Sequence, residues 1–128
     1  MKVLLDTCVW IEWFTDSELA DNFIQYFEHL DEVVVPAIIQ YELYKWVCRE
    51  RDEATALEII ATTQQCFITL VDTSLALQAA DYAKQYGLAM ADALIYTTAQ
   101  QEKATLITID KHFENIPNVL YLPKNKFN

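Results

Sequence analysis

Residues 3–14 of the chain read VLLDTCVWIEWF, which is a short apolar run, an aspartate and then a stretch with helical periodicity. The run Val-Leu-Leu has no polar residue, as expected of a strand in a parallel sheet that is covered on both faces. Trp10, Trp13 and Phe14 recur at the spacing i, i+3 and i+4, which places them on one face of a helix. This stretch therefore predicts a strand that passes directly into a helix.

Four further apolar runs have the same character and are separated by longer stretches with helical periodicity. The runs are VVV (33–35), FITLV (67–71), TLITI (105–109) and VLYL (119–122). The helical stretches between them include ELADNFIQYFEHL (18–30), AIIQYELYKWVCRER (37–51), ATALEIIATTQQ (54–65), LALQAADYAKQY (75–86) and a last helix over 89–103. Strands that alternate with helices predict an α/β sandwich with a parallel sheet between helical layers.

The length and composition predict a single domain over residues 1–128. The chain is 53% hydrophobic and contains one glycine, and no Pro/Gly/Ser-rich linker divides it. A domain of this size buries roughly two-thirds of the surface that the unfolded chain exposes, so it folds without disulfide or metal staples. Disordered and repetitive classes of protein are excluded by the richness in Val, Ile, Leu and aromatic residues.

The net charge predicts which partners the protein avoids, and the cysteines predict the cellular compartment in which it works. The formal net charge is −10, which disfavours nonspecific binding to nucleic acids and to anionic membranes, although bound metal ions can invert the sign locally. The three cysteines form no CxxC pair, which is typical of a reducing compartment. No apolar run approaches the roughly 18 residues of a membrane span. We therefore expect a soluble cytoplasmic protein that does not bind membranes.

Carboxylates follow the strands at positions where α/β proteins bind ligands. Asp6 comes directly after the first apolar run and Asp110 directly after TLITI, and ligands collect beyond the carboxyl ends of parallel strands. Glu42 and Asp92, on expected helices, are able to reach the same crevice. Carboxylates that converge in this way need cations between them, and Mg²⁺ or Mn²⁺ prefer such oxygen ligands. The same positional logic nominates Asp72, so solvated surface acids remain the alternative.

Four segments of the chain resemble the motifs of the PIN domain, and more narrowly those of VapC-type toxins of toxin–antitoxin pairs. The segments are VLLDTCVWIEW, PAIIQYEL, GLAMADALIYTTAQ and ATLITIDKHF. They occur in the same order and at the same spacing as in the family, and the match spans nearly the whole chain. Each motif alone is weak, but the four together are specific.

The resemblance implies a PIN-like three-layer sandwich with a central parallel five-stranded sheet and the activity of a metal-dependent ribonuclease. It implies Mg²⁺ or Mn²⁺ as cofactor, and RNA, a cognate antitoxin and a second copy of the chain as partners. The catalytic and metal-binding positions of the family fall here on Asp6, Glu42, Asp92 and Asp110, and its polar positions on Thr7 and Thr108, which we expect to bind substrate. Cys8 departs from the family, which more often has Ser or Asn there.

Two basic residues are candidates for contacts with phosphates. Lys45 and Arg49 are spaced i, i+4 on the expected helix that carries Glu42, where they flank the crevice. A salt bridge between Lys45 and Glu42 at i, i+3 is an equally good explanation of this pattern. No histidine is required for the chemistry, and we expect His112 to point to solvent.

Aromatic residues recur on two of the expected helices. The face formed by Trp10, Trp13 and Phe14 has a counterpart in Tyr41 and Tyr44. Burial in the core is the commoner explanation of such faces, and a surface for a protein partner is the alternative.

Two other functions remain open. The first is a PIN-fold binding or regulatory module with little catalysis, because a strongly acidic surface repels RNA. The second is a receiver-like domain that accepts phosphate on Asp6, although the paired acids expected at the first strand of such a domain are missing. Loss of activity on Asp92→Asn substitution distinguishes the enzyme from the binding module.

Overall fold

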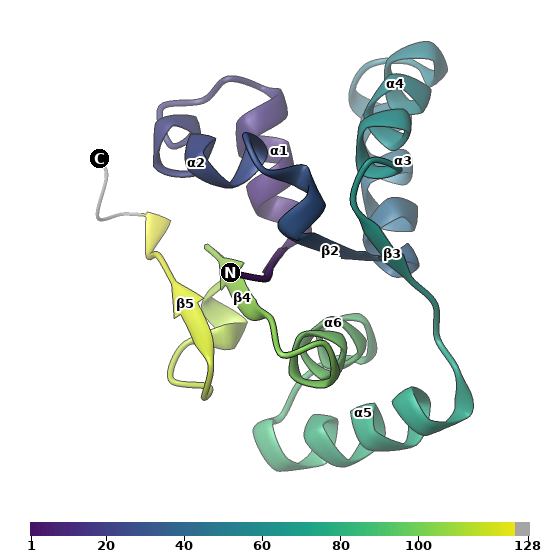
Figure 1. Cartoon of the computed structure of the whole chain (residues 1–128), viewed down its shortest axis with the longest axis vertical. Helices are drawn as coiled ribbons and strands as arrows, with labels where there is room; N and C mark the ends of the chain where they lie inside the picture. Colours follow the sequence, from purple (N-terminus) through teal and green to yellow (C-terminus); the bar gives the residue numbers. More distant parts are fainter. Residues whose placement is uncertain (125–128) are drawn as a thin grey trace.

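A computed structural model describes residues 1–124, so residues 125–128 of the expected domain lie outside the described residues. Five parallel strands form one sheet in the order β3-β2-β1-β4-β5 (Figure 1). The strands are β1 (Val3–Leu5), β2 (Val33–Pro36), β3 (Phe67–Thr69), β4 (Thr105–Thr108) and β5 (Val119–Tyr121). The predicted five-stranded parallel sheet is confirmed.

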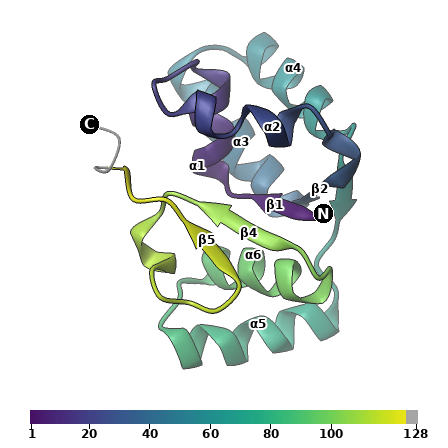
Figure 2. The same cartoon turned by 60° about the vertical axis from the view of Figure 1, so that its left-hand side comes forward.

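Within residues 1–124, six α-helices surround the sheet. They are α1 (Thr7–Phe14), α2 (Ile24–Phe27), α3 (Ala37–Glu50), α4 (Glu53–Thr63), α5 (Thr73–Tyr86) and α6 (Met90–Gln101), joined by the short 3₁₀ turns η1 (Ala20–Asn22), η2 (Leu30–Glu32) and η3 (Lys111–Phe113). α1 and α2 lie on one face and α5 and α6 on the other, while α3 and α4 pack together beside α1 (Figures 1 and 2). The predicted α/β class, with helices flanking a parallel sheet, is confirmed.

Local sequence explains where several helices begin and end. The carboxylates of Asp6, Asp52 and Asp72 each accept a hydrogen bond from a backbone N–H in the first turn of α1, α4 and α5, respectively. These bonds satisfy donors that a helix leaves free at its N-terminus. Gly87 ends α5 with a φ of 68°, in the left-handed region that favours glycine.

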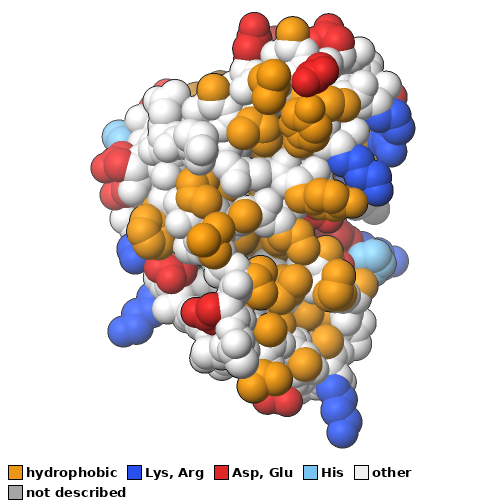
Figure 3. Space-filling model, turned by 90° about the vertical axis from the view of Figure 1, so that its right-hand side faces the viewer, with side chains coloured by type: hydrophobic (Ala, Val, Ile, Leu, Met, Phe, Trp, Pro, Cys, Tyr) orange, Lys and Arg blue, Asp and Glu red, His pale blue; other side chains and the backbone are white. Residues whose placement is uncertain are grey.

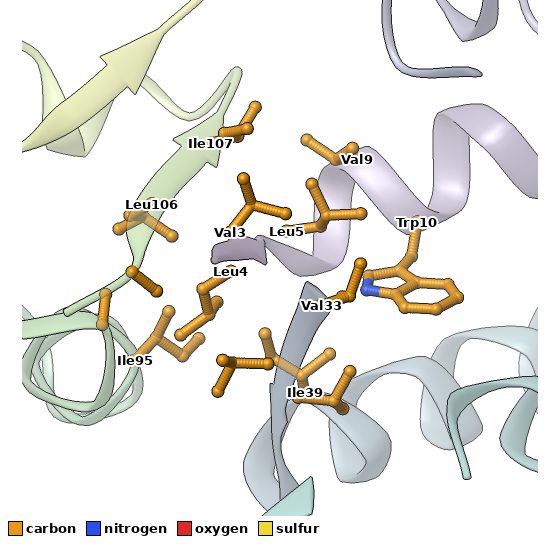
Figure 4. Packing of buried hydrophobic residues seen from close by; sticks show 14 of the residues in the cluster. Val3, Leu4, Leu5, Val9, Trp10, Val33, Ile39, Ile95, Leu106 and Ile107 are labelled. Carbon is orange, nitrogen blue, oxygen red and sulfur yellow. The ribbon is translucent and has the colours of Figure 1, made fainter. Parts of the chain in front are cut away.

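The core is centred on β1, β2 and β4. Their side chains are buried on both faces, and Figure 4 shows Leu4 among residues of neighbouring elements, including Ile95 and Leu106. Trp10 is fully buried, and Trp13 stacks on Phe27 with ring centroids 4.2 Å apart. Trp13 and Phe14 are half-buried and pack against the core, so the interpretation of the face on α1 as core is confirmed. The same interpretation is wrong for Tyr41 and Tyr44, which are both exposed on α3.

The sequence prediction of one helix over residues 18–30 is wrong. The chain instead forms η1, the single turn of α2 and η2, with a non-helical backbone at His29 (φ −133°, ψ 63°). A continuous helix of 13 residues would extend about 20 Å in one direction. The broken path brings Leu19, Ala20 and Phe23 into buried positions before the chain enters β2.

The apolar run FITLV (67–71) is also less buried than expected. It forms the edge strand β3 and the following loop, and Phe67, Leu70 and Val71 are exposed. An edge strand has a neighbour on one side only, and Val71 lies beside the groove between α5 and α6.

Within residues 1–124, no helix has both the length and the apolar character needed to cross a bilayer.

The register of the central strands determines where the candidate site lies. β1 pairs with β2 and with β4, and Leu5 at the end of β1 lies opposite Ile107 in β4. The residues that follow these strands, including Asp6 and Asp110, therefore emerge at the same edge of the sheet.

Candidate active site

Asp6 is the buried centre of the site. Its Oδ1 atom accepts a hydrogen bond from the backbone N–H of Thr7 at 2.8 Å, and its Oδ2 atom accepts one from the hydroxyl of Thr108 at 2.7 Å. The Thr108 hydroxyl in turn accepts the backbone N–H of Asp110 at 2.9 Å. These bonds connect the ends of β1 and β4 through polar side chains and orient the Asp6 carboxylate.

The environment of Asp6 disfavours its negative charge. Burial raises the pKa of Asp6 to about 7; the hydrogen bonds from Thr108 and Thr7 oppose this shift, and the negative charges of Asp92 and Asp110 add to it. A buried carboxylate beside other carboxylates has this property because no water compensates its charge. A cation at this position would stabilise the ionised form.

Glu42 and Asp92 approach from the two helices that flank these strand ends. Glu42, on α3, accepts a hydrogen bond from the Thr7 hydroxyl at 2.6 Å. Asp92 lies in the first turn of α6, and its pKa is raised by burial and by the negative charges of Asp110 and Glu42, against the opposing effect of His112. Thr7 therefore contacts two acids, one through its backbone and the other through its hydroxyl.

His112 contacts the two acids at the solvent side of the site. Its Nδ1 atom lies 3.1 Å from Oδ1 of Asp110 and 3.5 Å from Oδ2 of Asp92. The side chain is 77% exposed, as the sequence predicted, but the sequence prediction missed both contacts. The local signal for these contacts is its position two residues after Asp110, whose side chain caps η3 by accepting the backbone N–H of His112.

The four predicted acids line one pocket of about 390 Å³. Its walls are formed by Asp6, Thr7, Cys8, Ile11, Glu42, Asp92, Ile109, Asp110 and Lys124. Asp72, the other acid at a strand end, caps α5 through Leu75 and does not line this pocket. Sequence reasoning did not identify Lys124, whose Nζ atom forms an ion pair of 3.3 Å with Glu12.

Cys8 occupies the position where the sequence departs from the PIN pattern. Its Sγ atom lies 3.7 Å from Oδ2 of Asp6 and 3.5 Å from the hydroxyl oxygen of Thr108. Burial, with a further contribution from the Asp6 charge, raises the pKa of Cys8 to about 12. The thiol is therefore neutral and takes part in the same polar contacts around Asp6.

A second pocket of about 290 Å³ lies beside the acidic one along α3. It shares Thr7, Ile11 and Glu42 with the acidic pocket and is also lined by Tyr41, Lys45, Trp46 and Arg49. Among residues 1–124, no ion pair joins Lys45 to Glu42; the Lys45 ammonium lies 5.7 Å from the Tyr41 ring centre instead. The structure therefore does not support the alternative explanation, a salt bridge between Lys45 and Glu42.

The donor set fits a divalent cation. Within the described part of the chain, no lysine or arginine forms an ion pair with any of the four acids. Four carboxylates in one pocket without such a partner are stabilised when a hard divalent ion with oxygen ligands neutralises them. Asp92, Asp110 and His112 also offer ligand atoms that lie within 4.8 Å of one another.

A parallel sheet that gathers four carboxylates beyond its strand ends, between α3 and α6, defines a PIN-like α/β protein. The family model "PIN domain" matches residues 3–119, and the chain belongs to this family of nucleases. A search of curated proteins found no match.

Solved structures share the fold at low sequence identity. A toxin–antitoxin complex from Klebsiella pneumoniae is similar with a TM-score of 0.79 and 23% identity, over 92% of this chain and 95% of that chain. VapBC2 from Rickettsia felis, bound to a DNA fragment from its promoter, is similar with a TM-score of 0.73 and 21% identity, over 95% and 98%. DNA-bound VapBC from Salmonella typhimurium is similar with a TM-score of 0.69 and 17% identity, over 95% and 97%.

Proposed function

We propose that this chain is a metal-dependent endoribonuclease and the toxin of a toxin–antitoxin pair. The observation that carries the proposal is the convergence of Asp6, Glu42, Asp92 and Asp110 in one open pocket at the carboxyl edge of the sheet. Membership in the PIN family supports hydrolysis of phosphodiester bonds. The similar structures that are described as toxin–antitoxin complexes support the biological role.

Asp6, Asp92 and Asp110 are the proposed ligands of Mg²⁺ or Mn²⁺. When bound, such an ion supplies charge neutralisation at the phosphoryl oxygens and a more acidic water. The hydrogen bonds from Thr7 and Thr108 keep both oxygens of Asp6 in a defined orientation. Because burial opposes the ionisation of Asp6, the carboxylate becomes fully charged at pH 7 only when positive charge is nearby.

Glu42 is the proposed general base. Its Oε1 atom is held by the Thr7 hydroxyl, which leaves the other oxygen to accept a proton from the attacking water. Thr7 also donates its backbone N–H to Asp6, so a single residue fixes the relative orientation of the base and the innermost acid. Neither a histidine nor a cysteine is needed as the base or nucleophile of this reaction, and the neutral Cys8 thiol is not a nucleophile at pH 7.

The pocket along α3 is the proposed path of single-stranded RNA. Lys45 and Arg49 provide positive charge for phosphates, and the exposed Tyr41 ring provides a surface for base stacking. The net charge of −10 repels RNA elsewhere on the molecule, so we expect weak intrinsic affinity that falls steeply with salt.

The proposed protein partners are a cognate antitoxin and a second copy of the chain. A groove of about 530 Å³ between α5 and α6 is lined by small and apolar side chains, among them Ala80 and Leu94. Val71 and Met90, which are both exposed, also line it. Figure 3 shows hydrophobic side chains gathered in the lower half of the view. We assign the groove to the second copy and the acidic pocket to the antitoxin.

We also propose that residues 1–128 act as a single domain in the cytoplasm.

The proposal is tested by calorimetric titration of the purified protein with Mn²⁺ and by cleavage of single-stranded RNA. Saturable binding and cleavage are expected for the wild type, and Asp92→Asn removes cleavage. The matched control is Asp72→Asn, because Asp72 also follows a strand but lies outside the pocket, and asparagine caps α5 equally well. If the wild type cleaved RNA no faster than Asp92→Asn, the proposal that the four acids catalyse cleavage would be contradicted. The alternative, a PIN-fold binding or regulatory module with little catalysis, would then be favoured.

A further inference from the structure

A side-chain nitrogen, Nδ1 of His112, lies against two acids of the site although the four-acid pattern does not include it. Asp110 accepts the backbone N–H of His112 at 3.0 Å, and the imidazole Nδ1 of the same residue lies 3.1 Å from the same carboxylate oxygen. The turn η3 therefore directs both the backbone and the ring of His112 toward Asp110. The ring also reaches Asp92, at 3.5 Å, so it bridges an acid in the loop that follows β4 and an acid in α6.

The burial of these three side chains gives the cluster an inner and an outer side. Asp92 and Asp110 are 18% and 31% exposed, whereas His112 is 77% exposed. The imidazole therefore contacts the two carboxylates at the more exposed side of the cluster. Asp6 lies at the inner side, where the Thr108 hydroxyl and the Cys8 thiol surround its Oδ2 atom.

We infer that His112 is a metal ligand through Nδ1, together with Asp92 and Asp110, and that this donor set selects Mn²⁺ over Mg²⁺. The ligand atoms of the three residues already lie within 4.8 Å of one another. Mg²⁺ prefers an all-oxygen octahedral shell, whereas imidazole is a good ligand for first-row transition metals. The inference rests on the proposed metal-dependent function and adds the identity of the metal to it.

An ion pair is the competing explanation of the same contacts. In that case the imidazole pairs with both carboxylates only while the metal is absent, and a bound metal ion would displace it from them. The two explanations differ in what happens at His112 after metal binding. In the ligand arrangement Nδ1 is deprotonated and stays in contact with the ion, while the other ring nitrogen carries the proton on the solvent side.

Pulsed electron paramagnetic resonance of the Mn²⁺-loaded protein tests the inference directly. Electron spin-echo modulation from a coordinated ¹⁴N nucleus is expected for the wild type and absent from His112→Ala. The matched control is His29→Ala, which alters the other histidine of the chain. His29 is also exposed and lies beside the N-terminal end of β1, away from the acids, so its variant should keep the modulation.

Calorimetry on the same proteins gives the second measurement. We expect His112→Ala to weaken Mn²⁺ binding by about tenfold or more, the size of effect seen for groups that support a metal site, and to leave the Mg²⁺ affinity unchanged. Mn²⁺ binding to the wild type without nitrogen modulation would overturn the inference and leave the proposed function intact. An equal loss of Mn²⁺ and Mg²⁺ affinity in His112→Ala would likewise overturn the inference and leave the proposed function intact. Absence of any Mn²⁺ binding by the wild type would overturn both.

Discussion

The hydroxyl of Thr108 donates a hydrogen bond of 2.7 Å to Asp6, a residue 102 positions earlier in the chain. The same oxygen accepts the backbone N–H of Asp110 at 2.9 Å. One buried hydroxyl thus connects the innermost acid of the pocket with the backbone that carries another acid. This arrangement links the stability of the sheet edge to the geometry of the candidate metal site.

Replacing Thr108 by valine should destabilise the fold and weaken metal binding together. Valine has the same shape but leaves the Asp110 N–H without its partner and Asp6 Oδ2 with only the Cys8 thiol. Loss of a partner costs about 1–3 kcal/mol for buried groups. Urea unfolding and Mn²⁺ titration at pH 8 measure the two effects. Thr108→Ser is the control because it retains the hydroxyl; if Thr108→Ser lost as much Mn²⁺ affinity as Thr108→Val, the hydroxyl would not be the cause.

Asp6→Asn should raise the stability of the metal-free protein at pH 8. The pKa of Asp6 is about 7 in the folded state and near 3.8 in the unfolded state, so the folded state binds more protons between these values. Stability therefore falls as pH rises from about 4 to about 7, and the loss is complete above that range. Asparagine removes the charge and remains a good N-cap for α1.

Thermal unfolding across this pH range, without metal and with Mn²⁺, measures the effect of Asp6→Asn. The gain in melting temperature should be several degrees at pH 8 and absent at pH 4. Added Mn²⁺ should raise the melting temperature of the wild type, because a metal that binds the folded state stabilises it. It should not raise that of Asp6→Asn, which lacks a proposed metal ligand. If Asp6→Asn were less stable than the metal-free wild type at pH 8, the claim that the charge of Asp6 destabilises the metal-free fold would be refuted.

Thr7→Val should separate the role of Glu42 from metal binding. The backbone N–H of Thr7 still holds Asp6, while the 2.6 Å hydrogen bond to Glu42 is lost. If Glu42 acts as the base, RNA cleavage should slow by about tenfold or more, and Mn²⁺ affinity should stay the same. Thr7→Ser should restore the rate. A matching loss of Mn²⁺ affinity would instead make Glu42 a metal ligand.

Gly87→Ala should destabilise the protein by about 1 kcal/mol. Gly87 has a φ of 68°, and no atom lies within 4 Å of a Cβ placed there, so the cost comes from the left-handed backbone alone. Chemical denaturation measures it. Gly87→Asn should cost less, because asparagine tolerates this conformation better than alanine. Equal losses for the two variants would argue against backbone strain as the cause.

Ala80→Glu should convert a dimer into a monomer. Ala80 lies on the exposed side of α5 in the apolar groove, where a buried charge without a partner is strongly unfavourable. Gln85→Glu is the matched control on the same helix, since this exposed residue does not line the groove. Light scattering after gel filtration gives the mass of each protein. A wild-type monomer, or dimers of both variants, would exclude the groove as the interface.

The central sheet and the convergence of the acids were predictable because both depend on local sequence patterns. Continuous apolar runs indicate strands with two buried faces, and parallel strands end at the same edge of a sheet. The positions of Asp6 and Asp110 after such runs were therefore sufficient to expect them at one edge, and the motif spacing added Glu42 and Asp92. Ion pairing at i, i+3 is a weak local preference, and for Lys45 the contact with Tyr41 replaced it.

Only the tertiary structure decided which strand-end acids share a pocket. Asp72 and Asp110 have equivalent positions in sequence, yet Asp72 follows the edge strand β3 and caps a helix, whereas Asp110 follows β4 beside β1. The break of the expected helix over 18–30 likewise follows from core packing. The contact between His112 and Asp92 also depends on long-range packing, because it joins α6 to a turn beyond β4. Local patterns determine most of the elements, but the broken segment over 18–30 and the contacts between distant elements depend on tertiary packing and on how the sheet orders the strands.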